Sequence, residues 1–191
     1  MSHYRTIGER HKVEGLPPRT EVETEGGVMR PACRWCGKAC MGRRSTFCSG
    51  TAAKVSRDGY IKTPGSGCVH EWLIRADLSY ARRLVLARDG GVCALCLTDT
   101  YALHQAARVM DRASRGWYDG PEPKDSIIFG AFAALGYTRK DFDRMTWWDM
   151  DHVIPVEEGG GECGLDGLRT LCIPCHRKVT AEQARRRAAA A

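Results

Sequence analysis

Cysteine spacing is the first chemical signal in this chain, which has ten cysteines among 191 residues. Three pairs have C-x-x-C spacing: Cys33/Cys36, Cys93/Cys96 and Cys172/Cys175. Two thiolates so spaced suit tetrahedral Zn²⁺, whose sulfur ligands lie at about 2.3 Å. Disulfides would need an oxidising compartment, and the opening MSHYRTIGER lacks the apolar stretch of an export signal. The spacing therefore favours zinc, and we expect a cytoplasmic protein.

The cysteines form two candidate four-ligand sets. The first consists of Cys33, Cys36, Cys48 and Cys68. Cys40 and His70 are alternative fourth ligands for this set. The second joins distant segments and consists of Cys93, Cys96, Cys172 and Cys175. Because a structural zinc ion contributes on the order of 10 kcal/mol to folding, we expect both sites to be structural. Cys163 belongs to neither set, and we expect it to be a buried apolar residue.

A second kind of chemistry is indicated near the C-terminus by Asp151, His152 and His176. A carboxylate and an imidazole hold a divalent cation while leaving positions open for water and phosphate oxygens. A neighbouring histidine, with an ordinary pKa of about 6.5, accepts a proton from an attacking water at neutral pH. This combination predicts metal-assisted hydrolysis, with Asp151 and His176 as ligands and His152 as the base.

Those side chains must be positioned by a strand, a loop, a second strand and a helix. The pattern predicts strands over 150–156 and 168–171, separated by the EEGGG turn, and a helix with Pro174 in its first turn. Successive strand residues point to opposite faces, so Asp151 can face the helix and His176 while His152 faces elsewhere.

Upstream, the chain divides into further segments. We expect a disordered lead-in over residues 1–28, a zinc-binding module over 29–78 with a helix starting at Cys68, and a domain over 79–191 containing a helical insert at 97–146. Within the insert, helices are predicted at 101–115 and 125–136, with a shorter piece after Thr138. His104 falls among apolar residues of the first helix and is expected to be structural.

The charge distribution favours a nucleic-acid partner. Twenty-nine basic against 23 acidic residues give a formal charge of +6. The residues expected to contact DNA phosphates are Arg82, Arg83, Arg177, Lys178, Arg185 and Arg186. The uncharged stretch over 127–138 is too short for a membrane helix, which needs about 20 apolar residues. The expected partner is therefore DNA and not a membrane.

The motifs resemble the HNH (ββα-metal) endonuclease family. In that family an Asp-His pair ends the first strand, an Asn follows the His by 15 residues, and a metal-binding His follows by 9 more; here the same counts lead from His152 to position 167 and to His176. A subgroup carries C-x-x-C before the motif and C-x-x-C-H within it. ARDGGVCALC and DHVIPVEEGGGECGLDGLRTLC are similar to that subgroup, including the HNH domain of a fork-remodelling annealing helicase. CRWCGK, FCS and CVHEW are similar to the zinc module that precedes such domains.

The resemblance implies an α+β fold: a treble-clef-like zinc module, a helical insert and a ββα-metal nuclease module with a structural Cys₄ zinc. It implies cleavage of duplex or branched DNA with two structural Zn²⁺ ions and Mg²⁺ or another divalent cation at the catalytic site. In this reading His152 is the general base, and Asp151 and His176 hold the cation. Thr180 lies where some relatives have a further ligand.

One residue departs from the family pattern. Position 167 is Gly167, where the family has an Asn that orients the general base. The alternative function is therefore a zinc-supported DNA-binding module with weak or no catalysis, and a third is a protein-interaction adaptor.

Overall fold

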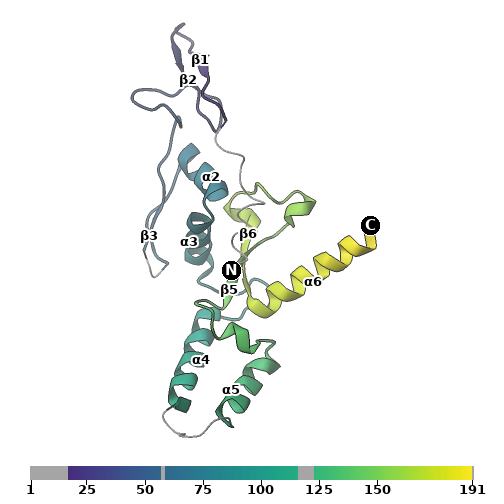
Figure 1. The fold of residues 1–191 in the computed structure, drawn as a ribbon. Helices are drawn as coiled ribbons and strands as arrows, with labels where there is room; N and C mark the ends of the chain where they lie inside the picture. Colours follow the sequence, from purple (N-terminus) through teal and green to yellow (C-terminus); the bar gives the residue numbers. More distant parts are fainter. Residues whose placement is uncertain (1–16, 57–58, 116–122, 191) are drawn as a thin grey trace. The chain divides into compact units, whose positions relative to one another are not determined.

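The computed structural model describes residues 17–56, 59–115 and 123–190 of an α+β chain (Figure 1). Two compact units are formed, one by residues 1–88 with 152–168 and the other by 89–151 with 169–191. The division thus differs from the boundary expected at residues 78 and 79. Within the described residues, no helix has both the length and the apolar character needed to cross a bilayer.

The first unit begins with two short antiparallel hairpins. Their strands are β1 (Glu21–Glu23), β2 (Met29–Pro31), β3 (Lys54–Val55) and β4 (Ile61–Thr63). Gly27, with φ +73°, allows the turn that brings Val22 opposite Arg30. Disorder over 1–28 therefore does not hold for the strand residues 21–23, while residues 1–16 lie outside the described residues. The β3–β4 hairpin lies between Cys48 and Cys68, in a stretch rich in Gly, Ser and Thr.

Two helices supply the core of this unit. They are α2 (Gly67–Ala76) and α3 (Leu78–Asp89). Ile74, Leu84 and Val85 are buried. The Tyr80 hydroxyl accepts a hydrogen bond from the Ala53 N–H at 2.6 Å and lies 2.6 Å from Nδ1 of His70. These polar contacts anchor the zinc-module segment to α3.

Arginines from these helices hold the loop over residues 152–168. Arg75 Nε donates to the Glu162 carbonyl at 3.0 Å, and Arg88 donates to the Leu165 and Leu168 carbonyls at 2.8 and 2.7 Å. A Cβ at Gly160 would lie 1.8 Å from the Ile154 carbonyl oxygen, so only glycine fits there. These contacts explain why residues 152–168 belong to the first unit.

The second unit contains the predicted helical insert. Helices α4 (Thr100–Arg115) and α5 (Pro123–Ala134) lie side by side (Figure 1), followed by a 3₁₀ turn at Arg139–Asp141 with the expected Thr138 capping box. The core cluster consists of Ala107, Phe132, Tyr137, Trp147 and Ile173. His104 is buried, with its ring centroid 5.3 Å from that of Trp147, and burial followed by the charge of Arg108 lowers its pKa. His104 thus packs in the core.

Two strands and a helix complete the chain. They are β5 (Trp148–His152), β6 (Leu168–Cys172) and α6 (Ile173–Ala190), and β5 pairs with β6. The prediction of a strand over 150–156 was shifted: β5 starts two residues earlier and ends at His152, because Pro155 and a 3₁₀ turn over Val156–Glu158 follow. Pro174 lies in the first turn of α6, as predicted.

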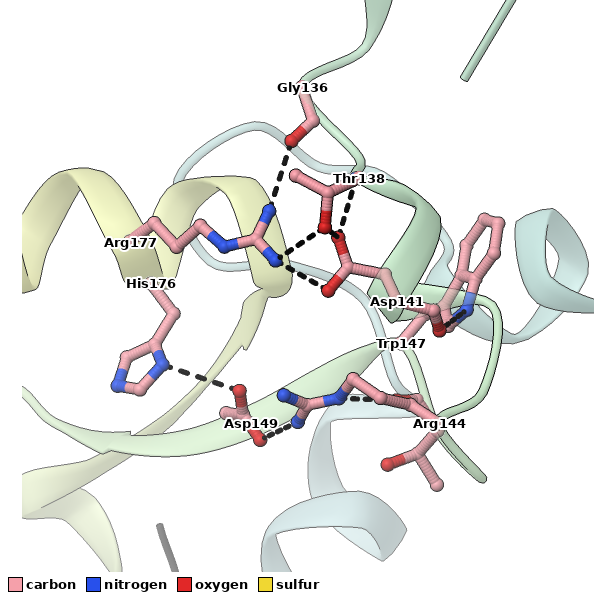
Figure 2. A network of polar contacts seen from close by, with 9 residues as sticks. Gly136, Thr138, Asp141, Arg144, Trp147, Asp149, His176 and Arg177 are labelled. Carbon is pink, nitrogen blue, oxygen red and sulfur yellow. Dashed lines mark hydrogen bonds and ion pairs between the residues drawn. The ribbon is translucent and has the colours of Figure 1, made fainter. Parts of the chain in front are cut away.

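An ion pair between the exposed Arg177 and the buried Asp141 joins α6 to the insert. Arg177 donates to Oδ1 of Asp141 at 2.5 Å, to the Thr138 hydroxyl at 3.3 Å and to the Gly136 carbonyl at 3.3 Å (Figure 2). The Trp147 indole N–H donates to the Asp141 carbonyl at 2.9 Å. Burial would raise the pKa of Asp141, but Arg177 and Thr138 outweigh it, so the pKa lies below its ordinary value.

Replacing Arg177 is expected to destabilise the protein. Arg177→Met leaves Asp141, which is 2% exposed, without its cation, and should lower the free energy of unfolding by about 1–3 kcal/mol in urea titrations at pH 7. Because the folded pKa of Asp141 is depressed, the pair's contribution is present above the ordinary carboxyl pKa and is lost as pH falls through the folded pKa. Arg185→Met, on an exposed turn of the same helix, is the control; equal stability of the two variants would contradict this assignment.

Candidate metal centres and active site

The first cysteine cluster comes from the N-terminal module. Its ligand atoms, from Cys33, Cys36, Cys48 and Cys68, lie within 4.8 Å of one another. The Cys36–Cys48 and Cys48–Cys68 sulfur distances are both 3.5 Å, near the edge of about 3.8 Å that follows from four sulfurs at 2.3 Å from a tetrahedral zinc. Cys40 and His70, the alternative ligands, are not in the cluster. These residues could therefore hold a zinc ion.

Electrostatics in this cluster favour a cation. Burial opposes ionisation of Cys33, but hydrogen bonds from the backbone of Cys36 and Cys48 lower its pKa to about 6. Burial and the neighbouring sulfurs raise the pKa of Cys68 to about 12. Four sulfurs this close cannot all ionise without a counter-charge, and a divalent ion supplies it.

The second cluster joins the segment before α4 to the start of α6. Its ligand atoms, from Cys93, Cys96, Cys172 and Cys175, also lie within 4.8 Å, with Cys96 and Cys172 sulfurs 3.6 Å apart. The buried Leu171 packs with Cys93 and Cys172, and the Ala94 N–H donates to the Thr170 carbonyl at 2.8 Å. Burial would raise the pKa of Cys96, but hydrogen bonds from Thr98 bring it to about 6, whereas burial raises that of Cys175 to about 11. This site too could hold zinc.

Strand β5 carries acidic side chains on one face and buried residues on the other. Asp149 and Asp151 are half-buried, whereas Trp148, Met150 and His152 are buried, in strict alternation. His152 therefore lies on the opposite strand face from Asp151, as predicted. It is the last residue of β5, and the next N–H, of Val153, donates to the Gly167 carbonyl at 2.8 Å.

The two predicted cation ligands each have a charged partner. Arg169 of β6 donates to Oδ2 of Asp151 from Nε at 3.2 Å and Nη2 at 3.0 Å. His176 of α6 has its Nδ1 3.3 Å from Oδ2 of Asp149 (Figure 2). Asp149 also binds Arg144, through Oδ1 at 2.6 Å. Shared ligation by Asp151 and His176 stays a prediction.

Sequence patterns did not predict Arg169 as the partner of Asp151, or Arg144 and Asp149 beside His176. One sequence signal could have indicated Asp149. It lies two residues before Asp151, and residues two apart in a strand lie on the same face. Carboxylate oxygens and an imidazole nitrogen, which Asp151 and His176 carry, are of the kind that binds Mg²⁺ or Mn²⁺. Among the described residues, only the two cysteine clusters bring three or more metal-ligating side chains together, so a cation site at Asp151 and His176 stays a prediction.

Gly167 lies against Cys163. A Cβ at position 167 would lie 2.4 Å from the Cys163 Cβ and 2.6 Å from its sulfur, both far inside van der Waals contact. The half-buried Cys163 side chain thus occupies the space where the family's Asn side chain begins. Burial raises the pKa of the Cys163 thiol, so it stays neutral.

The basic residues of α6 border a groove. Its volume is about 550 Å³, and its lining residues are Arg169, Lys178, Val179, Ala181, Glu182, Arg185 and Arg186. Arg83 and Thr180 are exposed, and Arg82 is half-buried. Arg177 is engaged with Asp141, so a DNA contact for it stays a prediction.

The β5–β6–α6 arrangement, closed by a four-cysteine site, has the ββα architecture of metal-dependent nucleases. Residues 138–182 match the model of the HNH endonuclease family. The chain belongs to this family through that region.

The chain is similar to mouse and human proteins that carry the same name. The chain is 35% identical over 182 residues to the mouse "DNA annealing helicase and endonuclease ZRANB3", covering 92% of this chain and 15% of the relative. The human protein of that name is 32% identical over 127 residues, covering 63% of this chain and 11% of the relative. The crystal structure of the human ZRANB3 HNH domain has 30% identity and a TM-score of 0.44, covering 60% of this chain and 96% of that one. The chain thus spans less than a sixth of the curated relatives' length.

Metal content should separate the alternative ligands of the first cluster. We expect two zinc ions per chain by native mass spectrometry, falling to one in Cys68→Ser and remaining two in Cys40→Ala. The buried Cys40 serves as a matched control because it lies close by in sequence but outside the cluster. Retention of both ions by Cys68→Ser with a loss in Cys40→Ala would contradict the ligand set.

Proposed function

We propose that this chain is a metal-dependent HNH endonuclease that hydrolyses phosphodiester bonds in duplex or branched DNA. The observation that carries the proposal is the β5–β6–α6 region, whose acidic strand face and α6 histidine occur within the segment that matches the HNH family. Two structural zinc ions hold the module together, one in each cysteine cluster. The names of the mouse and human relatives include endonuclease activity, which agrees with the proposed function.

In this proposal each residue has a defined task. A divalent cation, when bound, stabilises negative charge on the reacting phosphate and the leaving oxygen. Asp151 and His176 hold that cation through a carboxylate oxygen and an imidazole nitrogen. His152 accepts the proton of the attacking water, which requires its neutral form and therefore a pH above the imidazole pKa.

DNA binding is assigned to basic side chains. Lys178, Arg185 and Arg186 border the α6 groove, and Arg82 and Arg83 lie on α3. Guanidinium and ammonium groups bind phosphates irrespective of sequence, so affinity should fall steeply with salt. We propose little sequence preference for this reason.

The second candidate function is a DNA-binding module with little catalysis. Gly167 favours it, because no side chain is present there to orient His152. Retained salt-sensitive DNA binding without cleavage under Mg²⁺ or Mn²⁺ would support this candidate, and absence of DNA affinity would support a protein-interaction adaptor.

Removal of the proposed base should abolish most cleavage. His152→Gln is expected to slow plasmid nicking with Mg²⁺ or Mn²⁺ by about 10²–10⁴-fold, since general-base catalysis contributes that range. His104→Gln is the matched control, because both histidines are 8% exposed and a loss of buried packing would affect both. With zinc content equal in all three proteins, equal nicking by His152→Gln and wild type would remove His152 from the mechanism.

Placing the family's Asn at position 167, with no other change, is expected to destabilise the protein without increasing cleavage. Gly167→Asn should lower stability by about 1–3 kcal/mol through overpacking against Cys163, with no gain in nicking. Cys163→Gly combined with Gly167→Asn removes the clash, and this pair should regain stability and nick faster than Cys163→Gly alone. Gly164→Asn is the loop control, since a Cβ there meets only Arg75 at 3.5 Å. A stable Gly167→Asn single variant would contradict the clash.

A further inference from the structure

Asp149 contacts the charged side chain of Arg144 and the ring of His176. Its Oδ1 accepts a hydrogen bond from Nη2 of Arg144 at 2.6 Å, and its Oδ2 lies 3.3 Å from Nδ1 of His176. Figure 2 shows the carboxylate between the imidazole of α6 and the guanidinium. The side chains of Asp149 and His176 are only 15% and 17% exposed, so solvent screens this contact weakly.

Arg144 is itself held in place. Its Nε donates to the Thr146 carbonyl at 3.4 Å, and its Nη2 forms the 2.6 Å ion pair with Asp149. Strand β5 fixes the backbone of Asp149, and the second cysteine cluster fixes the start of α6, where His176 follows Cys175. The Asp149 carboxylate beside the His176 ring is thus restrained by its strand backbone and by its ion pair with Arg144.

A histidine that binds a metal through one ring nitrogen commonly donates its other N–H to a carboxylate, which fixes the tautomer and the ring orientation. Here Nδ1 faces Asp149, so the proton belongs on Nδ1 and Nε2 is the nitrogen that binds a cation. Asp149 is less suited to bind the cation directly, because Arg144 and His176 already approach its two oxygens. By contrast, Nε and Nη2 of Arg169 both donate to Oδ2 of Asp151.

We infer that Asp149, anchored by Arg144, is a positioning residue that holds His176 in the Nδ1–H tautomer with Nε2 presented to a divalent cation. This inference rests on the proposed function for the role of His176 as a ligand. The tautomer itself is a property of the protein without the catalytic cation, so it is tested separately from cleavage.

The first experiment measures the tautomer of His176 by long-range ¹H–¹⁵N NMR of the zinc-loaded protein at alkaline pH, without Mg²⁺ or Mn²⁺. Wild type should show the proton on Nδ1. Asp149→Ala should move it largely to Nε2, the form favoured by a free imidazole, and Asp149→Asn should retain Nδ1–H because the amide oxygen still accepts. Asp143→Ala, an exposed acid six residues upstream of Asp149 in the same unit, is the control.

The second experiment measures Mn²⁺ affinity by electron paramagnetic resonance. Asp149→Ala should weaken it about 10–100-fold, the usual effect of losing an orienting partner, and Asp149→Asn should recover part of that loss. Arg144→Gln should weaken it less than Asp149→Ala, and it serves as the second variant if Asp149→Ala does not fold.

Two results would overturn the inference. One is an unchanged Nδ1–H tautomer in Asp149→Ala and Arg144→Gln. The other is complete loss of Mn²⁺ affinity in Asp149→Asn with the tautomer intact, because that pattern identifies Asp149 as a direct ligand. A tautomer change in a protein whose wild type cleaves no DNA would instead uphold the positioning role and reject the nuclease function.

Discussion

The four-cysteine convergence of Cys93, Cys96, Cys172 and Cys175 is the constraint on which the active-site region depends. It joins segments more than 70 residues apart at the point where β6 ends and α6 begins. Because His176 directly follows Cys175, any loss of this convergence would free the first turn of α6. Within the described residues each sheet has only two strands, so a metal ion bound by these cysteines would add much to the order of this turn.

Contacts between charged side chains also hold the start of α6 in place. Arg177 fastens α6 to the insert through the buried Asp141, while His176 on the neighbouring position faces Asp149 (Figure 2). Adjacent helix residues point in directions about 100° apart, so one turn of α6 contacts both the insert and the acidic face of β5. The insert therefore helps to hold α6, because its 3₁₀ turn provides the Asp141 carboxylate that binds Arg177.

Residues 163 and 167 compete for the same space in the loop before β6. Cys163 fills the position where a side chain at residue 167 would start, so glycine there is required by packing in this loop. The departure from the family pattern is thus coupled to a neighbour and cannot be reversed alone. Arg75 and Arg88 hold this loop in place by donating hydrogen bonds to its backbone carbonyls.

The cysteine sets, the helices of the insert, the returning strand and the start of α6 could all be predicted from the sequence, because C-x-x-C spacing, capping residues, glycines and Pro174 act over a few residues. The extent of β5, the β1 strand and the partners of Asp151 and His176 could not, since these depend on which segments meet in space. Alternation along β5 places Asp149 and Asp151 on one face, but only the packing of α6 and Arg144 decides which carboxylate meets the histidine. Local spacing fixes the donor types; tertiary contacts fix their pairing.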